Sequence, residues 1–324
     1  MIGKVCGTGS YLPNRIVSNT ELSQLVDTSD EWIRERTGIR CRHIAVKETT
    51  SDMASKAAKK AVSNGGIDPG EIELILVATS SPDVIYPSVA CVVQKNIRAE
   101  NALAFDINGA CSGFMVAFNT AQAYIRAGVF KTILVIGAES MSRLVDWRDR
   151  STCVLFGDGA GAVLIRAEEG EAYWQAGHSD GMKDFVLTLN SKDQFEEQTE
   201  SSPGCLSAKS GICMDGQEVF KFAVRKVPEL INELLEKSGL ETEKIALFIL
   251  HQANERIVKA VAKKMKVDEN RFPTNMENYA NTSAASIPIL LDELNREGKL
   301  KEGQTILLAG FGAGLTWAGC ILEW

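Results

Sequence analysis

The sequence has few histidines, no long hydrophobic run and no nucleotide-binding fingerprint. Three histidines are too few for a histidine-rich metal site, so we predict no metal. No apolar stretch approaches the ~20 residues that cross a bilayer, and no signal-peptide pattern follows the first methionine. We therefore expect a cytoplasmic protein that binds no membrane. Gly7 and Gly9 are followed by Leu12 instead of a third glycine, and no Walker A sequence occurs, which argues against hydride or phosphoryl chemistry with a nucleotide.

The cysteines and the charge exclude further classes of protein. None of the eight cysteines forms a C-x-x-C pair, so we expect reduced thiols. The 35 Lys and Arg residues against 42 Asp and Glu leave a formal charge of −7, which argues against general nucleic-acid binding. A length of 324 residues is enough for about two domains, each with its own core.

Short apolar runs alternate with amphipathic stretches along the chain. Strands are predicted over 73–78, 104–107, 132–136 and 245–250, and a long helix over 112–127. This alternation predicts an α/β protein whose largely parallel sheet has helices on both faces.

Local signals also predict several helix ends and one loop. Ser51 and Asp52 are expected to cap a helix that ends at Gly65-Gly66, and Pro87 to open the next helix. The polar stretch 190–217 is predicted to be a loop.

A glycine-rich pattern recurs about half a chain apart. Phe156-Gly157-Asp158-Gly159 and Phe311-Gly312-Ala313-Gly314 each stand between apolar runs that are predicted as strands. Such a repeat predicts two similarly folded halves, residues 1–169 and 170–324, related by a pseudo-twofold axis. Chance recurrence of a glycine-rich turn is the alternative.

Cys111 is the first candidate for chemistry. It stands in Asn108-Gly109-Ala110-Cys111-Ser112-Gly113, between a predicted buried strand and the first turn of a predicted helix. A helix N-terminus should lower the pKa of the thiol, and the flanking glycines would let a substrate approach the backbone. We interpret Cys111 as a nucleophile, with an inert buried cysteine as the alternative.

Two further residues join Cys111 through the predicted topology. His251 follows the apolar run 245–250, at the carboxyl end of a strand, where open α/β sheets hold their active sites. Asn281 precedes a predicted helix that runs towards Asn295, with a kink expected at Pro288. A pseudo-twofold would bring this helix N-terminus to that of the Cys111 helix. Taken singly, His251 could be a core histidine and Asn281 a turn residue.

These motifs resemble those of β-ketoacyl-acyl carrier protein synthase III. The resemblance rests on four stretches in order, from Asp106 to Gly113, from His251 to Ile257, from Asn281 to Pro288 and from Gly310 to Leu315, and it covers nearly the whole chain. It implies a thiolase fold of two pseudo-duplicated halves, with mixed sheets and buried central helices in αβαβα layers. The implied reaction is the decarboxylative condensation of an acyl-CoA, acetyl-CoA first, with malonyl-acyl carrier protein, which starts fatty acid synthesis.

The resemblance also implies roles for the residues that it matches. Cys111 would carry the acyl group, His251 and Asn281 would stabilise the enolate, and the backbone N–H groups of Cys111 and Gly314 would form the oxyanion hole. Coenzyme A is a substrate in this reaction and no cofactor is implied. The implied binding residues for coenzyme A are Thr28, Trp32, Arg36, Arg150, Phe220 and Asn254. Without the resemblance, the segment that holds Trp32 would be an ordinary capped helix with solvated arginines.

The implied partners are acyl carrier protein and a second copy of the chain. In the family, a phenylalanine at the position of Tyr86 crosses the dimer interface to close the acyl pocket, so the tyrosine here leaves the starter group open. The expected contacts with the acidic carrier protein are basic side chains: Lys221, Arg256, Lys259, Lys263 and Lys264. An ordinary solvated helix face is the alternative for this set. Two other functions also remain: a condensing enzyme of secondary metabolism with another starter, and a catalytically silent scaffold that binds acyl carrier protein.

Overall fold

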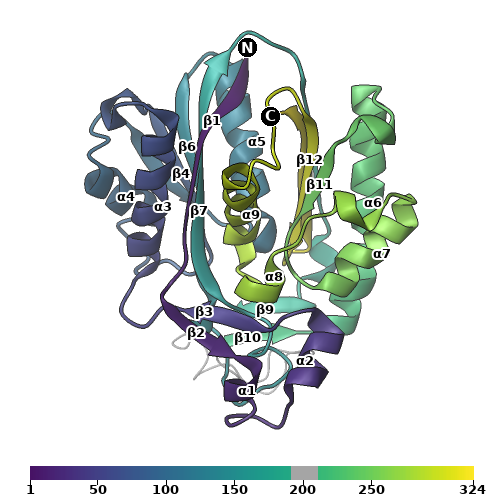
Figure 1. Ribbon diagram of the computed structural model, residues 1–324. Helices are drawn as coiled ribbons and strands as arrows, with labels where there is room; N and C mark the ends of the chain where they lie inside the picture. The colour runs from purple at the N-terminus through teal and green to yellow at the C-terminus, as the bar shows by residue number, and fades with distance from the viewer. Residues whose placement is uncertain (191–210) are drawn as a thin grey trace.

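The chain folds into five alternating layers of helix and sheet, shown in Figure 1. The structure is a computed structural model that describes residues 1–190 and 211–324. From left to right in the figure, the layers are α3 with α4, a first sheet, α5 with α9, a second sheet, and α6 with α7. Both chain termini lie at the top of this view. The αβαβα layering implied by the resemblance is present.

The first sheet has five strands in the order β1-β7-β6-β4-β5. These strands are β1 (Ile2–Tyr11), β4 (Leu74–Ala78), β5 (Leu103–Ile107), β6 (Thr132–Ser140) and β7 (Asp158–Glu168). β4 runs parallel to β5 and β6, whereas β7 pairs antiparallel with β6 and β1. The strands predicted over 73–78, 104–107 and 132–136 are confirmed. The prediction of a largely parallel sheet is wrong, because the sheet is mixed.

The second sheet has four strands in the order β11-β12-β13-β8. They are β8 (Tyr173–Ser179), β11 (Leu247–Leu250), β12 (Thr305–Gly312) and β13 (Thr316–Glu323). Only β11 and β12 are parallel; β12 and β13 form a hairpin, and β8 pairs antiparallel with β13. The predicted strand, glycine-rich turn and strand around Phe311 are therefore confirmed.

The two central helices are buried between the sheets. These are α5 (Gly113–Arg126) and α9 (Ser286–Arg296), and Phe114, Phe118 and Leu290 are among their core side chains. The outer helices are amphipathic and cover the outer sheet faces: α3 (Thr50–Gly65), α4 (Val89–Ile97), α6 (Gly216–Ser238) and α7 (Glu255–Met265). Because every sheet face is covered by helices, the strands can be apolar on both sides, as the sequence indicated.

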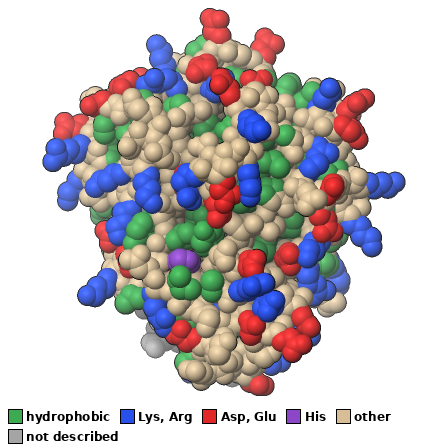
Figure 2. Space-filling model, viewed as in Figure 1, with side chains coloured by type: hydrophobic (Ala, Val, Ile, Leu, Met, Phe, Trp, Pro, Cys, Tyr) green, Lys and Arg blue, Asp and Glu red, His purple; other side chains and the backbone are tan. Residues whose placement is uncertain are grey.

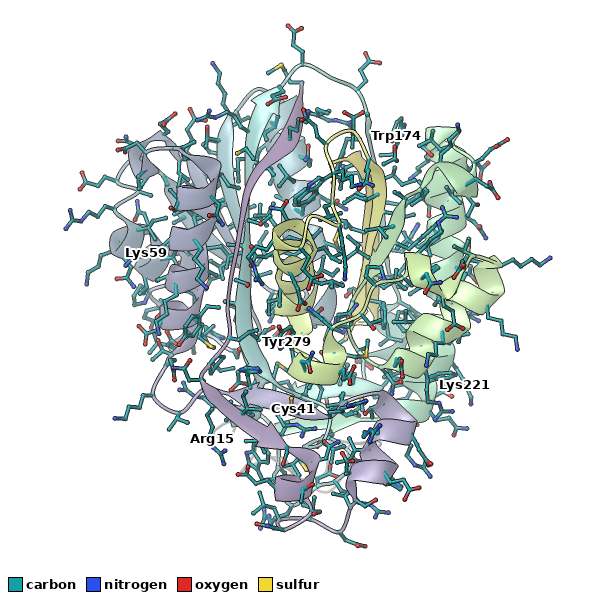
Figure 3. All side chains as sticks on the ribbon, in the orientation of Figure 1. Arg15, Cys41, Lys59, Trp174, Lys221 and Tyr279 are labelled. Carbon is teal, nitrogen blue, oxygen red and sulfur yellow. The ribbon has the colours of Figure 1, made fainter. Side chains whose placement is uncertain are left out.

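A smaller group of elements lies below the layers in Figure 1. It contains the hairpin β2 (Arg15–Ser18) and β3 (Cys41–Ile44), the pair β9 (Leu187–Asn190) and β10 (Gly211–Met214), and the helices α1 (Asn19–Leu22), α2 (Asp30–Thr37) and α8 (Met276–Tyr279). α8 lies against β3, where Tyr279 and Cys41 are labelled in Figure 3. Part of the predicted loop over 190–217 is thus strand and helix, and its residues 191–210 lie outside the described part.

Several predicted helix boundaries need correction. Thr49 caps α3, and its hydroxyl and the Asp52 carboxylate form a capping box, so the cap lies two residues before Ser51. Ser88 caps α4, and Pro87 precedes that cap instead of opening the helix. Pro288 lies in the first turn of α9, where its missing N–H costs no helical hydrogen bond, so no kink is required.

The glycine-rich repeat is only partly structural. Cys153-Val154-Leu155 forms a buried turn instead of a strand, so the first copy lacks its incoming strand. A three-residue apolar run could not distinguish these two conformations. The segments that enter the two central helices are more alike. Each is a three-residue 3₁₀ turn, Ala110–Ser112 before α5 and Ser283–Ala285 before α9. The first residue of each turn has a positive φ, 46° at Ala110 and 50° at Ser283. Cys111 thus corresponds to Ala284 in the second turn, and the division into duplicated halves at 169 and 170 stays a prediction.

None of the described helices is long and apolar enough to cross a membrane.

Candidate active site

Cys111 lies at the entry to the central helix α5. The chain leaves β5 at Ile107, turns through Gly109 and places Cys111 in the 3₁₀ turn before the helix. Gly312, at the end of β12, packs against it so closely that a Cβ there would lie 2.8 Å from the Cys111 amide nitrogen. Only glycine at this position leaves the backbone of Cys111 in place, and sequence analysis did not identify this role.

The electrostatic surroundings of Cys111 differ from the prediction. Its side chain is only 8% exposed, and burial raises the pKa of the thiol to about 12. A hydrogen bond with the Ser283 hydroxyl acts in the opposite direction and lowers the pKa. Burial thus opposes the lowering of the thiol pKa that the helix N-terminus was expected to produce.

His251 follows β11 directly, as predicted, and is fully enclosed. Its Nδ1 lies 2.7 Å from the hydroxyl oxygen of Ser286, the first residue of α9. The same oxygen accepts a hydrogen bond from the Gln252 amide at 3.3 Å. The ring packs edge-on against Phe311. Burial lowers the pKa of His251 to about 3, so the imidazole is neutral at physiological pH.

Asn281 is held by its backbone and by its side-chain oxygen. Its N–H donates to Leu155 and its carbonyl accepts from Gly157, at 2.9 and 3.0 Å. Its Oδ1 accepts a hydrogen bond of 2.8 Å from the backbone N–H of Ser283. Because Oδ1 is taken, the donor Nδ2 is the group that Asn281 can offer to a ligand.

Cys111, His251 and Asn281 line one cavity of about 610 Å³. The two helix entries that sequence analysis expected to meet do lie in contact. Five further predicted residues also line this cavity: Trp32, Arg36, Phe220, Asn254 and Arg256. The remaining predicted residues do not line it: Thr28, Tyr86, Arg150, Lys221, Lys259, Lys263, Lys264 and Gly314.

The outer end of the cavity brings together most of the predicted coenzyme A residues. Trp32 lies on α2, which Ser29 caps, and the guanidinium carbons of Arg36 and Arg150 lie 4.8 and 5.3 Å from its ring centroid. Arg150 thus belongs to this group although it does not line the cavity. The Asn254 side chain donates to the carbonyl of Arg36 at 3.0 Å, which ties α7 to α2.

Thr28 lies just before α2, and its hydroxyl oxygen is buried without a hydrogen-bond partner among the described residues.

The predicted basic face is partly neutralised. α7 buries Ile257, Val258 and Val261, and Ala262 beside them, and leaves its lysines exposed. Lys259 pairs with Glu255 at 2.9 Å, and Lys221 pairs with Glu218 at 3.0 Å. Figure 3 shows Lys221 at the edge of the molecule, near the start of α6. On the face in Figure 2, basic and acidic side chains are interspersed.

Arg256 differs from these lysines, because it lies over the ring of Phe220 at 5.7 Å and lines the cavity.

Tyr86 and Gly314 are two of the predicted residues that do not line the cavity, although Gly314 directly precedes Leu315, which does. Tyr86 is 83% exposed, next to Ile85 at 89% and Val84 at 52%. Gly314 has a φ of 133° and its nearest neighbour is Thr316, whereas Gly312 is the glycine that contacts Cys111. The oxyanion role of Gly314 therefore stays a prediction.

Sequence analysis missed three polar side chains around the catalytic candidates. Ser283 and Ser286 stand inside the Asn281 motif and contact Cys111 and His251. Glu139 is the penultimate residue of β6 and accepts a hydrogen bond from Ser283 at 3.1 Å. A carboxylate at the carboxyl end of an apolar strand was a usable signal for Glu139.

Comparison with known proteins identifies the family. The family model "3-Oxoacyl-[acyl-carrier-protein (ACP)] synthase III" matches residues 105–181, and its C-terminal counterpart matches residues 235–324. The β-ketoacyl-[acyl-carrier-protein] synthase III of Clostridium acetobutylicum is 48% identical over 99% of this chain and 98% of that protein. The chain belongs to the β-ketoacyl-acyl carrier protein synthase III family. It is therefore a condensing acyltransferase that joins an acyl-CoA to malonyl-acyl carrier protein and so initiates fatty acid synthesis.

Solved structures of β-ketoacyl-acyl carrier protein synthase III agree with the fold. The crystal structure of the Aquifex aeolicus synthase is 44% identical, with a TM-score of 0.92 over 99% of this chain and all of that chain. The priming β-ketosynthase of the R1128 polyketide pathway is 36% identical, with a TM-score of 0.93 over 99% of this chain and 96% of that one. The thiolase fold is thus established, and the relatives support a condensing enzyme.

Proposed function

We propose that Cys111, His251 and Asn281 carry out the two half-reactions of the condensation. The observation that supports this most is that the three side chains, from three separate segments, line one cavity. In the first half-reaction, the Cys111 sulfur attacks the thioester carbon of the acyl-CoA and displaces coenzyme A. The backbone N–H groups of Cys111 and Gly314 stabilise the oxyanion, and the close packing of Gly312 on Cys111 supports a role for this turn.

In the second half-reaction, malonyl-acyl carrier protein loses CO2 and the enolate oxygen needs hydrogen-bond donors. Ser286 accepts from Gln252 and can donate its own hydrogen to Nδ1 of His251, which leaves the imidazole proton on Nε2. Asn281 offers Nδ2 because Ser283 occupies its Oδ1. Two neutral donors therefore face the enolate, which then attacks the acyl group on Cys111.

Coenzyme A enters past α2 and α7 in this proposal. Trp32 offers a ring to the adenine, with Arg150 beside it, and Arg36 offers a charge to a phosphate. Asn254 and Phe220 also line the cavity along which the pantetheine arm reaches Cys111. The unpartnered hydroxyl of Thr28 supports a ligand contact near the start of α2.

Acyl carrier protein docks beside the same entrance. Among the basic side chains predicted to contact acyl carrier protein, Arg256 is the one that lines the cavity, so we give it the leading role. Lys263 and Lys264 add exposed charge on α7. Lys221 and Lys259 contribute less, because each already pairs with a glutamate.

The enzyme works as a homodimer in this proposal, in the cytoplasm. Val84, Ile85 and Tyr86 form a contiguous exposed apolar segment, which a partner subunit would cover. Tyr86 would then reach the partner's acyl pocket. We propose acetyl-CoA as the starter, with the tyrosine hydroxyl as the feature that could change this preference.

The acyl-enzyme tests this proposal. The protein is incubated with labelled acetyl-CoA and digested, and the labelled peptide is identified by mass spectrometry. We expect the acetyl group on Cys111, and a Cys111→Ala variant should accept none. Label on another cysteine would refute the assignment. A panel of acetyl-, branched- and longer acyl-CoA thioesters then decides the starter.

A further inference from the structure

A buried carboxyl group lies behind the proposed nucleophile, outside the cavity. Glu139 is the eighth residue of β6 and is 0% exposed. Its carboxylate accepts hydrogen bonds from the segment that follows β4, which contributes the Ser80 amide at 3.1 Å, the Ser81 hydroxyl at 2.5 Å and the Thr79 hydroxyl at 3.4 Å. From the other side it is met by the 3₁₀ turn that starts α9.

No cation balances this carboxylate among the described residues. The groups that face it from the β4 end and from the α9 entry are neutral hydroxyls and amides. Its pairing partner on β7 is Gly159, and the neighbouring carboxylate, Asp158, is bound to Ser142 and the Ala45 amide instead. Burial therefore raises the pKa of Glu139 to about 7. A carboxyl group in such a site can both take up and give back a proton at neutral pH.

Ser283 joins this carboxyl group to Cys111. Its hydroxyl donates to Oε1 of Glu139 at 3.1 Å and also hydrogen-bonds to the Cys111 sulfur. The serine holds this position with a φ of 50°, a left-handed conformation that costs energy for a residue with a side chain. Its backbone N–H is fixed by Asn281 at 2.8 Å. The three groups thus form a continuous chain, thiol to hydroxyl to carboxylate.

We propose that Glu139 takes the proton of Cys111 through Ser283 when Cys111 is acylated, and holds it until the acyl group leaves. This rests on the proposed function of Cys111 as nucleophile. Glu139 touches neither substrate nor sulfur, so it acts as a positioning and proton-holding residue through Ser283. The nucleophile needs such a base, because burial makes its thiol reluctant to ionise unaided.

The proton balance supports this assignment. In the first half-reaction the S–H bond of Cys111 breaks, Ser283 passes a proton on, an O–H bond forms on Glu139, and an S–C bond forms to the acyl carbon. Coenzyme A leaves as a thiolate and takes a proton from solvent. In the second half-reaction Cys111 leaves the acyl carbon as a thiolate, and Glu139 returns the proton by the same route. The one proton taken from solvent is the one that a decarboxylative condensation consumes.

His251 is the weaker candidate for this task. Burial lowers its pKa to about 3, whereas that of Glu139 is raised to about 7, so the carboxylate is the stronger proton acceptor at neutral pH. Nδ1 of His251 is also engaged by Ser286.

The test is the pH dependence of Cys111 acylation, measured by mass spectrometry after brief mixing of the full-length enzyme with acetyl-CoA. In the wild type the rate should rise to a plateau near pH 7 to 8, as Glu139 ionises. A positioned base contributes ~10²–10⁴-fold, so Glu139→Gln and Ser283→Ala should lose on this order at pH 7. Their rates should keep rising about tenfold per pH unit towards pH 9, because hydroxide replaces the base. Alkylation of Cys111 by iodoacetamide, without acetyl-CoA, should show the same change.

Asp158→Asn is the matched control, since it also replaces a buried carboxylate by an amide in the same sheet, without a link to Cys111. Its pH profile should match the wild type. Unchanged profiles in Glu139→Gln and Ser283→Ala, with Cys111 still the labelled residue, would overturn the proton-holding role alone. A change in Glu139→Gln but not in Ser283→Ala would overturn the route. Absence of label on wild-type Cys111 would instead overturn the proposed function. If Glu139→Gln does not fold, the Ser283→Ala profile decides.

Discussion

Asn281 combines a catalytic donor and a structural acceptor in one amide, and two substitutions separate these roles. Asn281→Ala removes both, whereas Asn281→Asp keeps an oxygen for the Ser283 N–H and loses the donor. The acceptor matters because Ser283 is buried and its N–H donates to Oδ1 of Asn281 at 2.8 Å.

The magnitudes follow from these two contacts. Loss of one donor to a developing oxyanion costs ~10²–10³-fold in rate, which is ~2.7–4 kcal/mol. A buried N–H left without an acceptor costs ~1–3 kcal/mol of folding free energy. We therefore expect both variants to lose malonyl decarboxylation by at least the first amount, and only Asn281→Ala to lose the second amount in the free energy of unfolding.

The assays measure each half-reaction separately. Release of labelled CO2 from malonyl-acyl carrier protein reports decarboxylation, transfer of labelled acetyl to Cys111 reports acyl loading, and urea titration reports stability. Acetyl loading by Asn281→Ala should stay near the wild-type rate. The reasoning fails if loading and decarboxylation fall equally in Asn281→Ala, or if Asn281→Asp is destabilised as much as Asn281→Ala.

Three other outcomes follow from the structure. Arg256→Glu should raise the KM for malonyl-acyl carrier protein and weaken the dependence of the rate on salt. Lys259→Gln should change the KM less, because Lys259 already pairs with Glu255, and equal effects of the two variants on the KM would contradict this reasoning. Tyr86→Asp should shift the dimer towards monomer in sedimentation, and an unchanged oligomer would place the interface elsewhere. Burial raises the Glu139 pKa from 4.5 to about 7, so its contribution to stability is full below pH 4.5 and is lost as pH rises through 7. The unfolding free energy of Glu139→Gln relative to the wild type should therefore rise by ~3 kcal/mol between pH 4.5 and 8 in urea titrations, and a constant difference would contradict the raised pKa.

Local sequence signals predicted helices and strands well where residues close together in the sequence determine them. The buried run of β4 and the capped, amphipathic α3 could be read from neighbouring residues. The direction of strand pairing could not, because β1 joins β7 across most of the first half of the chain. The turn at Cys153 was mistaken for a strand for the same reason, since its burial comes from distant segments such as β3, whose Arg42 donates to the Val154 carbonyl.

The candidate site shows the same limit in its electrostatics. The motifs located Cys111, His251 and Asn281 in sequence, and the topology argument brought two of the helix entries together. Yet the predicted lowering of the thiol pKa considered only the helix that Cys111 precedes. Its actual environment is set by Ser283, whose hydrogen bond to Glu139 spans 144 residues. No short stretch of sequence contains both residues of that contact. The packing that buries the Cys111 thiol, and so makes it hard to ionise, also places the Glu139 carboxylate near it. The base proposed for Cys111 is therefore defined only by the folded structure. A search for sequence motifs finds Cys111, His251 and Asn281 but does not find Glu139.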